Sequence, residues 1–373
     1  MNENAGKRAI RKLLDLADVR IGGDRPWDIQ VRNQGFFARV LAEGSLGLGE
    51  SYMDGWWECD ALDRFFARVL RAKLDRRART NREVLWAAMK ARVLNTQRRA
   101  KAFDIGKRHY DIDNDLFAVM LDKGMNYSCG YWREAEGLDA AQEAKMDLVC
   151  RKMGLASGMT LLDIGCGWGG FVKYAAETYG VKVIGITVSR EQAEFARVFC
   201  RGLPVEIRLQ DYRELRQRFD RIISIGMFEH VGFRNYRTYM RVVHRCLESK
   251  GLFLLHTIAG NSSTTTTDPW IDKYIFPNSM LPSSRQIASS VEGFFVLEDW
   301  HGFGPHYDKT LMAWHRNFNA RWEDIRNNYD ERFHRMWNYY LLSCAGCFRS
   351  RRNQLWQIVF SKDGVRGGYE SIR

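Results

Sequence analysis

Residues 160–170, which read TLLDIGCGWGG, decide the fold. An apolar run that includes a single acid, Asp163, leads into four glycines within six residues, Gly165, Gly167, Gly169 and Gly170. An apolar run ended by glycines is typical of a buried strand, and residues 171–180 then follow a helical pattern closed by a glycine. Glycines at such a junction let the backbone approach a ligand and leave helix N–H groups free. The stretch therefore predicts a strand, a ligand-binding turn and a helix.

Strands and helices alternate outward from this turn to the end of the chain. Further strands are predicted at 181–188, 204–209, 220–226, 251–259, 294–300 and 355–361. Helices are predicted at 189–202, with Ser189 as N-cap, and at 235–249. This alternation is typical of a parallel sheet covered on both faces, whose ligands bind at the carboxyl ends of the strands. We expect an α/β fold with a doubly wound, seven-stranded, mostly parallel sheet.

Residues 1–95 lack this alternation and are predicted to form a small, mainly helical domain. Hydrophobic residues from Leu62 to Val69 follow helical spacing, and LGLGESYMDGWW at 46–57 is predicted to be a glycine-containing turn. Residues 96–108 are polar and basic and are predicted to be a linker. Residues 109–373 are then expected to form the second, larger domain, which contains the alternating strands and helices.

The positive charge is concentrated in one segment. The chain carries a net charge of +12, and residues 64–108 hold 15 Lys and Arg against three acidic residues, an excess equal to that of the whole chain. Within the segment Leu85, Met89 and Val93 recur at helical spacing beside basic residues, as in an amphipathic helix on a membrane. The segment suits a polyanion, either nucleic acid or an anionic membrane surface. A solvated helix that packs its apolar stripe on its own domain explains the same residues.

The chain shows no sign of export or of membrane crossing. Its longest strongly apolar stretch, 252–259, is too short to span a bilayer, and its first residues lack the apolar core of a secretory signal. The eight cysteines are then expected to stay reduced, and no His or Cys cluster has metal-ligand spacing. We expect a cytoplasmic protein without a metal.

The glycine turn fits two classes of cofactor. Gly165, Gly167 and Gly170 satisfy G-x-G-x-x-G, a weak indication of a dinucleotide. However, Thr187 stands where a ribose-binding acid would follow the second strand, and Asp163 precedes the first glycine by two residues. The spacing Asp-x-Gly-x-Gly-x-Gly instead resembles the cofactor turn of class I S-adenosylmethionine-dependent methyltransferases. This disfavours a nicotinamide oxidoreductase.

Further segments make the resemblance more specific. They are GMNYSCGYW (124–132), GITVSREQ (185–192), GMFEHVG (226–232), LLHTI (254–258), DPWIDKYIFPN (268–278), GFGPHYDKTLMAW (302–314) and YYLLSCAGCFR (339–349). In this order they closely resemble the cyclopropane-fatty-acyl-phospholipid synthases, which are related to the mycolic acid cyclopropane synthases. The resemblance implies transfer of a methyl group from S-adenosylmethionine to the cis double bond of an unsaturated phospholipid acyl chain, followed by closure of a cyclopropane ring.

The resemblance also implies which residues hold S-adenosylmethionine. They lie in the loop before the sheet, in the glycine turn and after the second and third strands. The implied residues are Tyr127, Ser128, Leu161, Leu162, Asp163, Ile164, Gly165, Cys166, Gly167, Trp168, Gly169, Thr187, Gln192, Asp211 and Tyr212. Residues 187–192 would hold the ribose and methionine portions, and Asp211 and Tyr212 would flank the adenine.

A second implied set surrounds a bound bicarbonate ion. Its members are Cys129, Glu229, His256, Ile258 and Tyr307, with Cys344 matching a cysteine once considered catalytic in the family. Methyl addition to an alkene leaves a carbocation, and a base must then remove a proton from the new methyl group. Bicarbonate can accept that proton, whereas a side-chain carboxylate could be alkylated. Tyr307 and the Ile258 amide would donate hydrogen bonds to the anion, and Glu229 would either orient His256 or accept the bicarbonate hydroxyl proton.

Each of these residues taken singly has a structural explanation. Glu229 can cap a helix, His256 can be a core histidine, and Cys344 can be a small buried hydrophobe. Their joint order after successive strands favours the pocket. The alternatives are an enzyme that keeps the methyl group without ring closure, and a nucleic-acid methyltransferase that uses the basic segment. The second lacks both a recognisable nucleic-acid module and an Asn-Pro-Pro-Tyr-like motif at 226–232.

The resemblance and the charge together predict the surroundings of the enzyme. We expect its partner to be an unsaturated phospholipid in an anionic membrane, without nucleic acid. We expect peripheral association with the inner membrane surface and assembly as a homodimer.

Overall fold

The computed structural model describes residues 5–75, 77 and 114–373, which fall into two compact units. The helical unit comprises the described N-terminal residues up to Met120 together with Asp268–Pro277 and Trp314–Arg352. The sheet unit comprises Leu121–Thr267, Asn278–Ala313 and Asn353–Arg373. The predicted amphipathic helix around Leu85–Val93 and the predicted linker at 96–108 lie outside the described residues.

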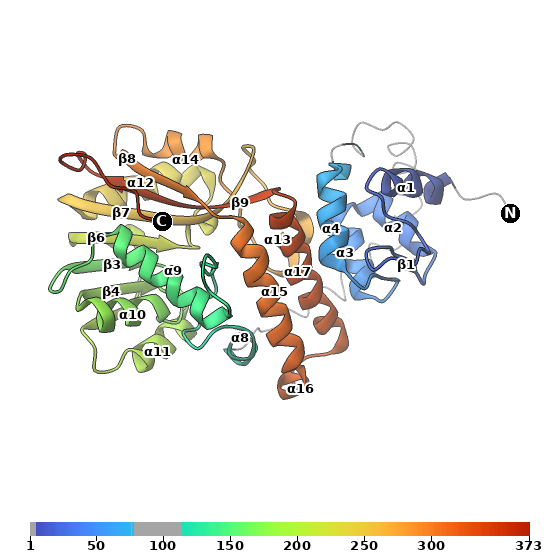
Figure 1. Ribbon diagram of the computed structural model, residues 1–373, viewed down its shortest axis with the longest axis horizontal. Coiled ribbons are helices and arrows are strands. Elements are labelled where there is room, and N and C mark those ends of the chain that lie inside the picture. The colour runs from blue at the N-terminus through green and yellow to red at the C-terminus, as the bar shows by residue number, and fades with distance from the viewer. Residues whose placement is uncertain (1–4, 76, 78–113) are drawn as a thin grey trace. The chain divides into compact units, whose positions relative to one another are not determined.

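The sheet unit is built on seven strands in the order β5-β4-β3-β6-β7-β9-β8 (Figure 1). Their bounds are β3 Thr160–Ile164, β4 Lys182–Thr187, β5 Val205–Leu209, β6 Phe219–Ile225, β7 Leu247–Gly260, β8 Val296–Gly302 and β9 Asn353–Ser361. Strands β3 to β7 pair in parallel, and β9 runs antiparallel to both of its neighbours. The expected doubly wound, mostly parallel sheet is confirmed. Since the strand order reverses between β3 and β6, a ligand site is expected at the carboxyl ends of these two strands.

Helices cover both faces of the sheet (Figure 1). On one face pack α9 (Leu138–Lys152), α10 (Gly170–Tyr179) and α11 (Arg190–Phe199), and on the other α12 (Tyr236–Cys246) and α14 (Ser284–Val291). Successive strand residues serve opposite cores, so that Leu161 packs with the first group of helices and Leu162 with the second. Burial on both faces explains why these strands are almost continuously apolar in sequence.

The helical unit has an aromatic core in which Trp57, Trp270 and Trp337 are almost completely buried. Its helices are α1 Ala5–Asp15, α2 Gly35–Glu43, α3 Ser45–Met53, α4 Leu62–Arg71, α8 Asn114–Met120, α13 Pro269–Tyr274, α16 Trp322–Ile325 and α17 Glu331–Arg349. A two-stranded sheet joins β1 (Gln30–Val31) to β2 (Trp57–Glu58), and α15 (Pro305–Ala320) begins in the sheet unit and ends in the helical unit. The predicted helix over 62–69 is confirmed as α4. Most of the glycine-containing stretch 46–57, predicted to be a turn, instead forms α3.

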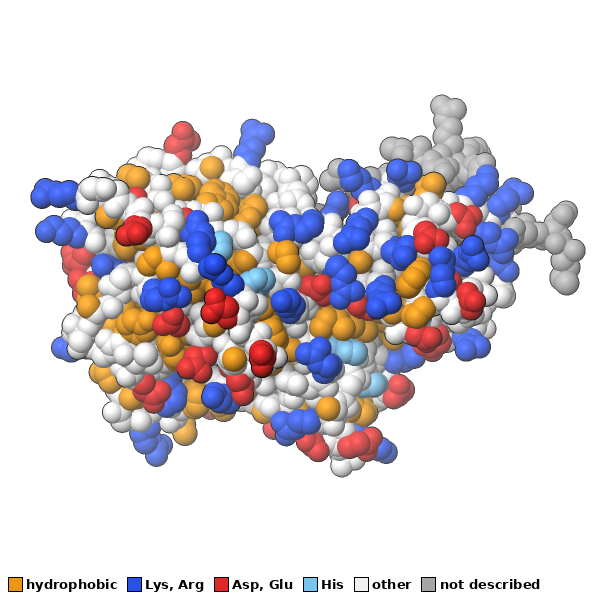
Figure 2. Space-filling model, in the orientation of Figure 1, with side chains coloured by type: hydrophobic (Ala, Val, Ile, Leu, Met, Phe, Trp, Pro, Cys, Tyr) orange, Lys and Arg blue, Asp and Glu red, His pale blue; other side chains and the backbone are white. Residues whose placement is uncertain are grey.

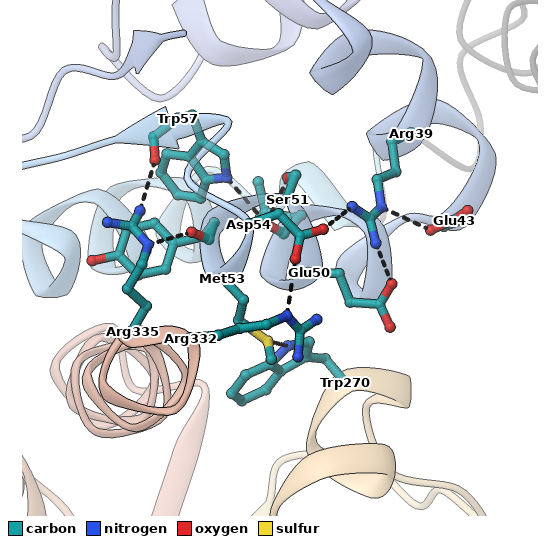
Figure 3. Close-up of polar contacts among 12 residues, drawn as sticks. Arg39, Glu43, Glu50, Ser51, Met53, Asp54, Trp57, Trp270, Arg332 and Arg335 are labelled. Atoms are coloured by element: carbon teal, nitrogen blue, oxygen red, sulfur yellow. Dashed lines mark hydrogen bonds and ion pairs between the residues drawn. The ribbon is translucent and has the colours of Figure 1, made fainter. Parts of the chain in front are cut away.

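Shared carboxylates tie the N-terminal helices to α17 within the helical unit (Figure 3). Arg39 of α2 donates to Glu50 of α3 and, at 2.6 Å, to Asp54 at the end of α3. Arg332 of α17 donates to the other oxygen of Asp54 at 3.0 Å, and Arg335 donates to a backbone carbonyl oxygen of α3 at 2.7 Å. Because cations from distant parts of the sequence share one carboxylate, α2, α3 and α17 are fixed as one packed body. None of the helices in the described part of the chain has the length and hydropathy needed to cross a membrane.

Candidate active site

The glycine turn after β3 forms at the switch point of the sheet. Its glycines at 165, 167 and 169 all have positive φ, a conformation that other residues adopt only with strain. The preceding side chains of Leu161, Leu162 and Ile164 are buried in the two cores, and Cys166 and Trp168 within the turn are also buried. These side chains support the turn and leave its backbone for contact with a ligand.

Asp163 is a buried acid with an unmet acceptor. Its side-chain atom Oδ1 has no hydrogen-bond partner among the residues that the structure describes. Burial raises the pKa of this carboxyl to about 7, and the ammonium group of Lys145 partly opposes the shift. Because folded chains rarely leave a buried polar atom unsatisfied, Asp163 fits a ligand that brings N–H donors or positive charge to the turn.

The loop that carries Tyr127, Ser128 and Cys129 lies directly against the glycine turn. A Cβ on Gly170 would clash with the carbonyl oxygen of Gly124, so the two backbones touch only because residue 170 is glycine. The residues of the loop and of the turn, which are far apart in sequence, are therefore brought together.

Two buried side chains of α9 hold this loop in place. Lys145 donates from Nζ to Asn126 Oδ1 at 3.2 Å and to Ser128 Oγ at 3.1 Å. Gln142, about one helical turn earlier, donates to the Ser128 carbonyl oxygen at 2.7 Å. Asp122 accepts from the backbone N–H of Asn126 at 2.8 Å and closes the loop. Burial lowers the pKa of Lys145 to about 8, with acidic neighbours partly opposing the shift.

The start of α15 holds the far end of the loop. Thr310 Oγ1 accepts from a backbone N–H of the loop at 3.1 Å and from Trp132 Nε1 at 2.8 Å, and His306 Nδ1 accepts from the Trp132 N–H at 2.9 Å. Cys129 is completely buried there, and burial raises the pKa of its thiol far above the ordinary value. Thr310 Oγ1 contacts Cys129 Sγ at 3.8 Å, and Tyr307 lies three residues before Thr310 in α15.

The remaining predicted cofactor residues follow the next two strands. Thr187 ends β4, and its hydroxyl donates to Gln192 Oε1 at 2.9 Å. After β5, Asp211 accepts from the guanidinium of Arg213 at 2.7 Å, and this pair lowers the pKa of Asp211. Tyr212 beside it is buried. Because β3, β4 and β5 are adjacent and parallel, these residues and the glycine turn all lie at the carboxyl ends of the strands, at the same end of the sheet.

Glu229 lies in the short helix η2 (Phe228–His230) after β6 and is 5% exposed. Its Oε1 accepts a hydrogen bond of 2.6 Å from the Ile258 amide, while Oε2 has no partner among the described residues. Burial raises the pKa of Glu229 to about 7, and the Ile258 amide partly opposes this. The Ile258 N–H, which we expected to bind an anion, thus serves Glu229.

His256 lies on β7 beside Ile225, the last residue of β6, and is 1% exposed. Its Nδ1 contacts Gln357 Nε2 at 3.2 Å, and its Nε2 has no partner in the described part of the chain. Burial and two nearby lysines of α9 hold the pKa of His256 well below its ordinary 6.5. The ring is therefore neutral, and the structure shows no hydrogen bond from it to Glu229.

Among the residues that the structure describes, Asp163 Oδ1, Glu229 Oε2 and His256 Nε2 are buried polar atoms without a partner, and they lie on or after the adjacent strands β3, β6 and β7. The same is true of Gln357 Oε1 on β9 and of the Tyr236 and Tyr239 hydroxyl groups on α12. Such a set can be satisfied by ligands that offer both donors and acceptors. A carboxyl with a pKa near 7 can also hold or release a proton at neutral pH.

Cys344 is not part of this set. It lies on α17 in the helical unit, and burial raises the pKa of its thiol well above the ordinary value. Such a thiol is protonated and a poor nucleophile. Among the residues that the structure describes, no group of three or more His, Cys, Asp or Glu is arranged to hold a metal ion.

Four supporting residues were not anticipated from the sequence: Gln142, Lys145, Thr310 and Gln357. Gln142 and Lys145 carried a usable signal, because they are polar residues on the buried side of a helix next to Ala141 and Met146. Buried polar side chains usually have a specific partner. The role of Gln357 depends on strand register, which the sequence pattern alone does not specify.

Known proteins share this organisation. The family model described as Mycolic acid cyclopropane synthetase matches residues 97–358. A cyclopropane-fatty-acyl-phospholipid synthase of Escherichia coli strain K12 is 55% identical over 366 residues, covering 98% of this chain and 96% of the relative.

Solved structures of cyclopropane synthases are also similar to this chain. The cyclopropane synthase MmaA2 from Mycobacterium tuberculosis has a TM-score of 0.64 at 32% identity and covers 70% of this chain and 98% of its own. The mycolic acid cyclopropane synthase CmaA1, solved in complex with SAH and CTAB, has a TM-score of 0.63 at 33% identity, with the same two coverages. The family model and the 55% identical relative therefore show that the chain belongs to the mycolic acid cyclopropane synthetase family.

Proposed function

We propose that this protein is a cyclopropane-fatty-acyl-phospholipid synthase. It transfers the methyl group of S-adenosylmethionine to a cis double bond in an unsaturated phospholipid acyl chain, and loss of a proton closes the ring. The observation that carries the proposal is the set of unpartnered buried atoms on Asp163, Glu229 and His256, found in a chain that is 55% identical to a synthase of this name.

The residues at the glycine turn suit S-adenosylmethionine. Asp163 offers an unmet acceptor, and Gly170 lets the loop bearing Ser128 approach the turn. Thr187 and Gln192 would hold the ribose and methionine portions, and Tyr212 would lie beside the adenine. When bound, this cofactor supplies an electrophilic methyl group. The chain's own contribution is to hold donor and alkene in line while excluding water.

Proton removal is the task that we assign to Glu229 and His256. A bicarbonate ion held there would accept a hydrogen bond from His256 Nε2–H and donate its own hydroxyl proton to Glu229 Oε2. Tyr307 would complete the pocket from the start of α15. The bicarbonate oxygen would then take the proton from the new methyl group of the acyl chain, and the ion can exchange with solvent afterwards. Cys344 has no part in this proposal.

Product analysis tests the reaction. The protein is incubated with methyl-labelled S-adenosylmethionine and vesicles of unsaturated phospholipid, and the acyl chains are analysed by mass spectrometry. We expect a methylene-bridged acyl chain, and turnover that falls in bicarbonate-depleted buffer and returns on adding bicarbonate. A methyl-branched or hydroxylated product would show that the methyl group is transferred without ring closure. The absence of any labelled lipid would overturn the proposal.

We also propose that the helical unit associates with the anionic inner membrane surface. Figure 2 shows Lys and Arg side chains spread over the visible face of this unit. Exposed cations include Arg8 and Arg11 of α1 and Arg64 and Arg71 of α4. Each basic residue near an anionic bilayer is worth about 1 kcal/mol. Assembly as a homodimer remains part of the proposal, and light scattering after size-exclusion chromatography measures it directly.

A further inference from the structure

The partner of His256 across the sheet is a second buried polar residue. His256 on β7 stands directly opposite Gln357 on β9 in the antiparallel register. Opposite residues of an antiparallel pair project to the same face of the sheet. Gln357 has no exposed surface and His256 is 1% exposed, so water does not compete for the contact between them.

The orientation of the Gln357 amide relates this contact to one tautomer of the imidazole ring. The amide nitrogen of Gln357 faces the ring, 3.2 Å from Nδ1 of His256, and its amide oxygen has no partner among the residues that the structure describes. In this orientation the amide nitrogen donates, and Nδ1 accepts through its lone pair. In a neutral imidazole the single proton then resides on Nε2.

The surroundings of the ring support this state. Burial and the positive charges of Lys145 and Lys152 hold the pKa of His256 well below 6.5, so the ring carries one proton and not two. Phe303 lies edge-on to the ring at a centroid distance of 5.9 Å and offers no acceptor. The Nε2–H therefore has no acceptor among the residues that the structure describes.

We propose that Gln357 is a positioning residue that holds His256 in the Nε2–H tautomer, so that the imidazole presents a hydrogen-bond donor to an oxyanion held beside Glu229. The identity of that anion as bicarbonate rests on the proposed function, but the tautomer does not. With the opposite tautomer, Nε2 would present a lone pair and would repel an anion.

The tautomer is measured directly in protein labelled with ¹⁵N-histidine. Long-range ¹H–¹⁵N correlation spectra distinguish a protonated Nε2 from a protonated Nδ1. We expect the Nε2–H form in the wild type. In Gln357→Glu the carboxylate accepts from Nδ1–H, so the tautomer should reverse. In Gln357→Met neither preference remains, and both forms should be populated.

Turnover should follow the tautomer. We expect kcat to fall roughly 10- to 100-fold in both variants, the range seen when the partner that orients a functional histidine is removed from metal sites. The KM for S-adenosylmethionine should stay within about twofold, because Gln357 is not placed at the glycine turn. Trp356→Phe is the matched control, since residue 356 is the neighbour on the same strand, pairs opposite Thr257 and contacts Trp300. It should leave tautomer and kcat unchanged.

The outcomes separate this inference from the proposed reaction. A wild-type Nδ1–H tautomer, or one unaltered in both Gln357 variants, would overturn the positioning role even if the enzyme makes cyclopropane lipids. If Gln357→Glu does not fold, as judged by circular dichroism, Gln357→Met decides the question alone. The wild type could also show an Nε2–H tautomer that changes in the Gln357 variants, while turnover does not depend on bicarbonate. This result would support the positioning role of Gln357 and would reject bicarbonate as the bound anion.

Discussion

At the scale of single residues, the ionisation of Glu229 gives a pH prediction. Burial raises the pKa of its carboxyl from 4.5 to about 7, so folding favours the protonated form. Its contribution to stability is complete below pH 4.5 and is lost as the pH rises through about 7. We expect the free energy of unfolding of the wild type to fall relative to Glu229→Gln across this window, by up to about 3 kcal/mol at 1.36 kcal/mol per pKa unit.

The measurement is urea denaturation at a series of pH values. Asp163, whose pKa is also raised, is present in both proteins, so the difference between them isolates Glu229. Glu194→Gln, which removes an exposed carboxylate on α11, serves as the control and should keep the free energy of unfolding close to that of the wild type. A flat difference for Glu229→Gln as well would show that Glu229 is solvated in solution.

Lys145 is the second residue whose effect can be isolated. Lys145→Met keeps the length of the side chain but removes the hydrogen bonds to Asn126 and Ser128, and the cation near Asp163. We expect the affinity for S-adenosylmethionine to fall at least tenfold, about 1.4 kcal/mol, because hydrogen bonds to a charged group are worth about 1.5–3 kcal/mol each. Titration calorimetry with S-adenosylmethionine measures this. Lys182→Met, a control at an exposed position, should bind S-adenosylmethionine normally. Normal binding by Lys145→Met would show that Lys145 is not needed to hold the loop for the cofactor.

At the scale of elements, close packing of α17 against α4 is the sensitive feature of the helical unit. A Cβ on Gly346 would lie 2.5 Å from Phe66 Cβ and 2.9 Å from the Asp63 carbonyl oxygen. We expect Gly346→Ala to cost about 1–3 kcal/mol of unfolding free energy, the usual cost of overpacking. Gly137→Ala, where a Cβ meets nothing within 4 Å, should cost less in the same denaturation experiment. Equal losses would show that α4 can move away from α17.

The elements also show how far the sequence could be read. Strand and helix types in the sheet unit followed from apolar runs and glycine turns, because both faces of the sheet are buried. The prediction of a turn at residues 46–57 was wrong because Gly49 lies in a helix, where the absence of a side chain makes room for the Trp270 indole. That contact joins residues distant in sequence. The role of Gln357 could not be predicted for the same reason, because its partner is determined by strand pairing and not by its neighbours in the chain.

At the scale of the whole molecule, the role of the net charge of +12 depends on where the basic residues lie. Lys and Arg are spread over the visible face of the helical unit, among acidic and hydrophobic side chains (Figure 2). This unit includes α1 and α4, whose exposed cations Arg8 and Arg64 have no carboxylate partner in an ion pair that the structure describes. If the helical unit binds anionic lipid, Arg8→Gln with Arg64→Gln should weaken binding to phosphatidylglycerol vesicles by about 2 kcal/mol, roughly 30-fold.

Vesicle sedimentation at low salt measures this, with phosphatidylcholine vesicles as the uncharged reference. Lys182→Gln with Arg201→Gln removes the same charge from exposed positions of the sheet unit and is the matched control. Binding to anionic vesicles should fall with added salt, because surface charges are screened beyond about 10 Å at 0.1 M. If both double variants lose affinity equally, the attraction belongs to net charge and not to the helical unit. If neither does, the membrane contact must lie elsewhere in the chain. In either case the two variants should retain wild-type affinity for S-adenosylmethionine, since none of the four positions lies at the glycine turn.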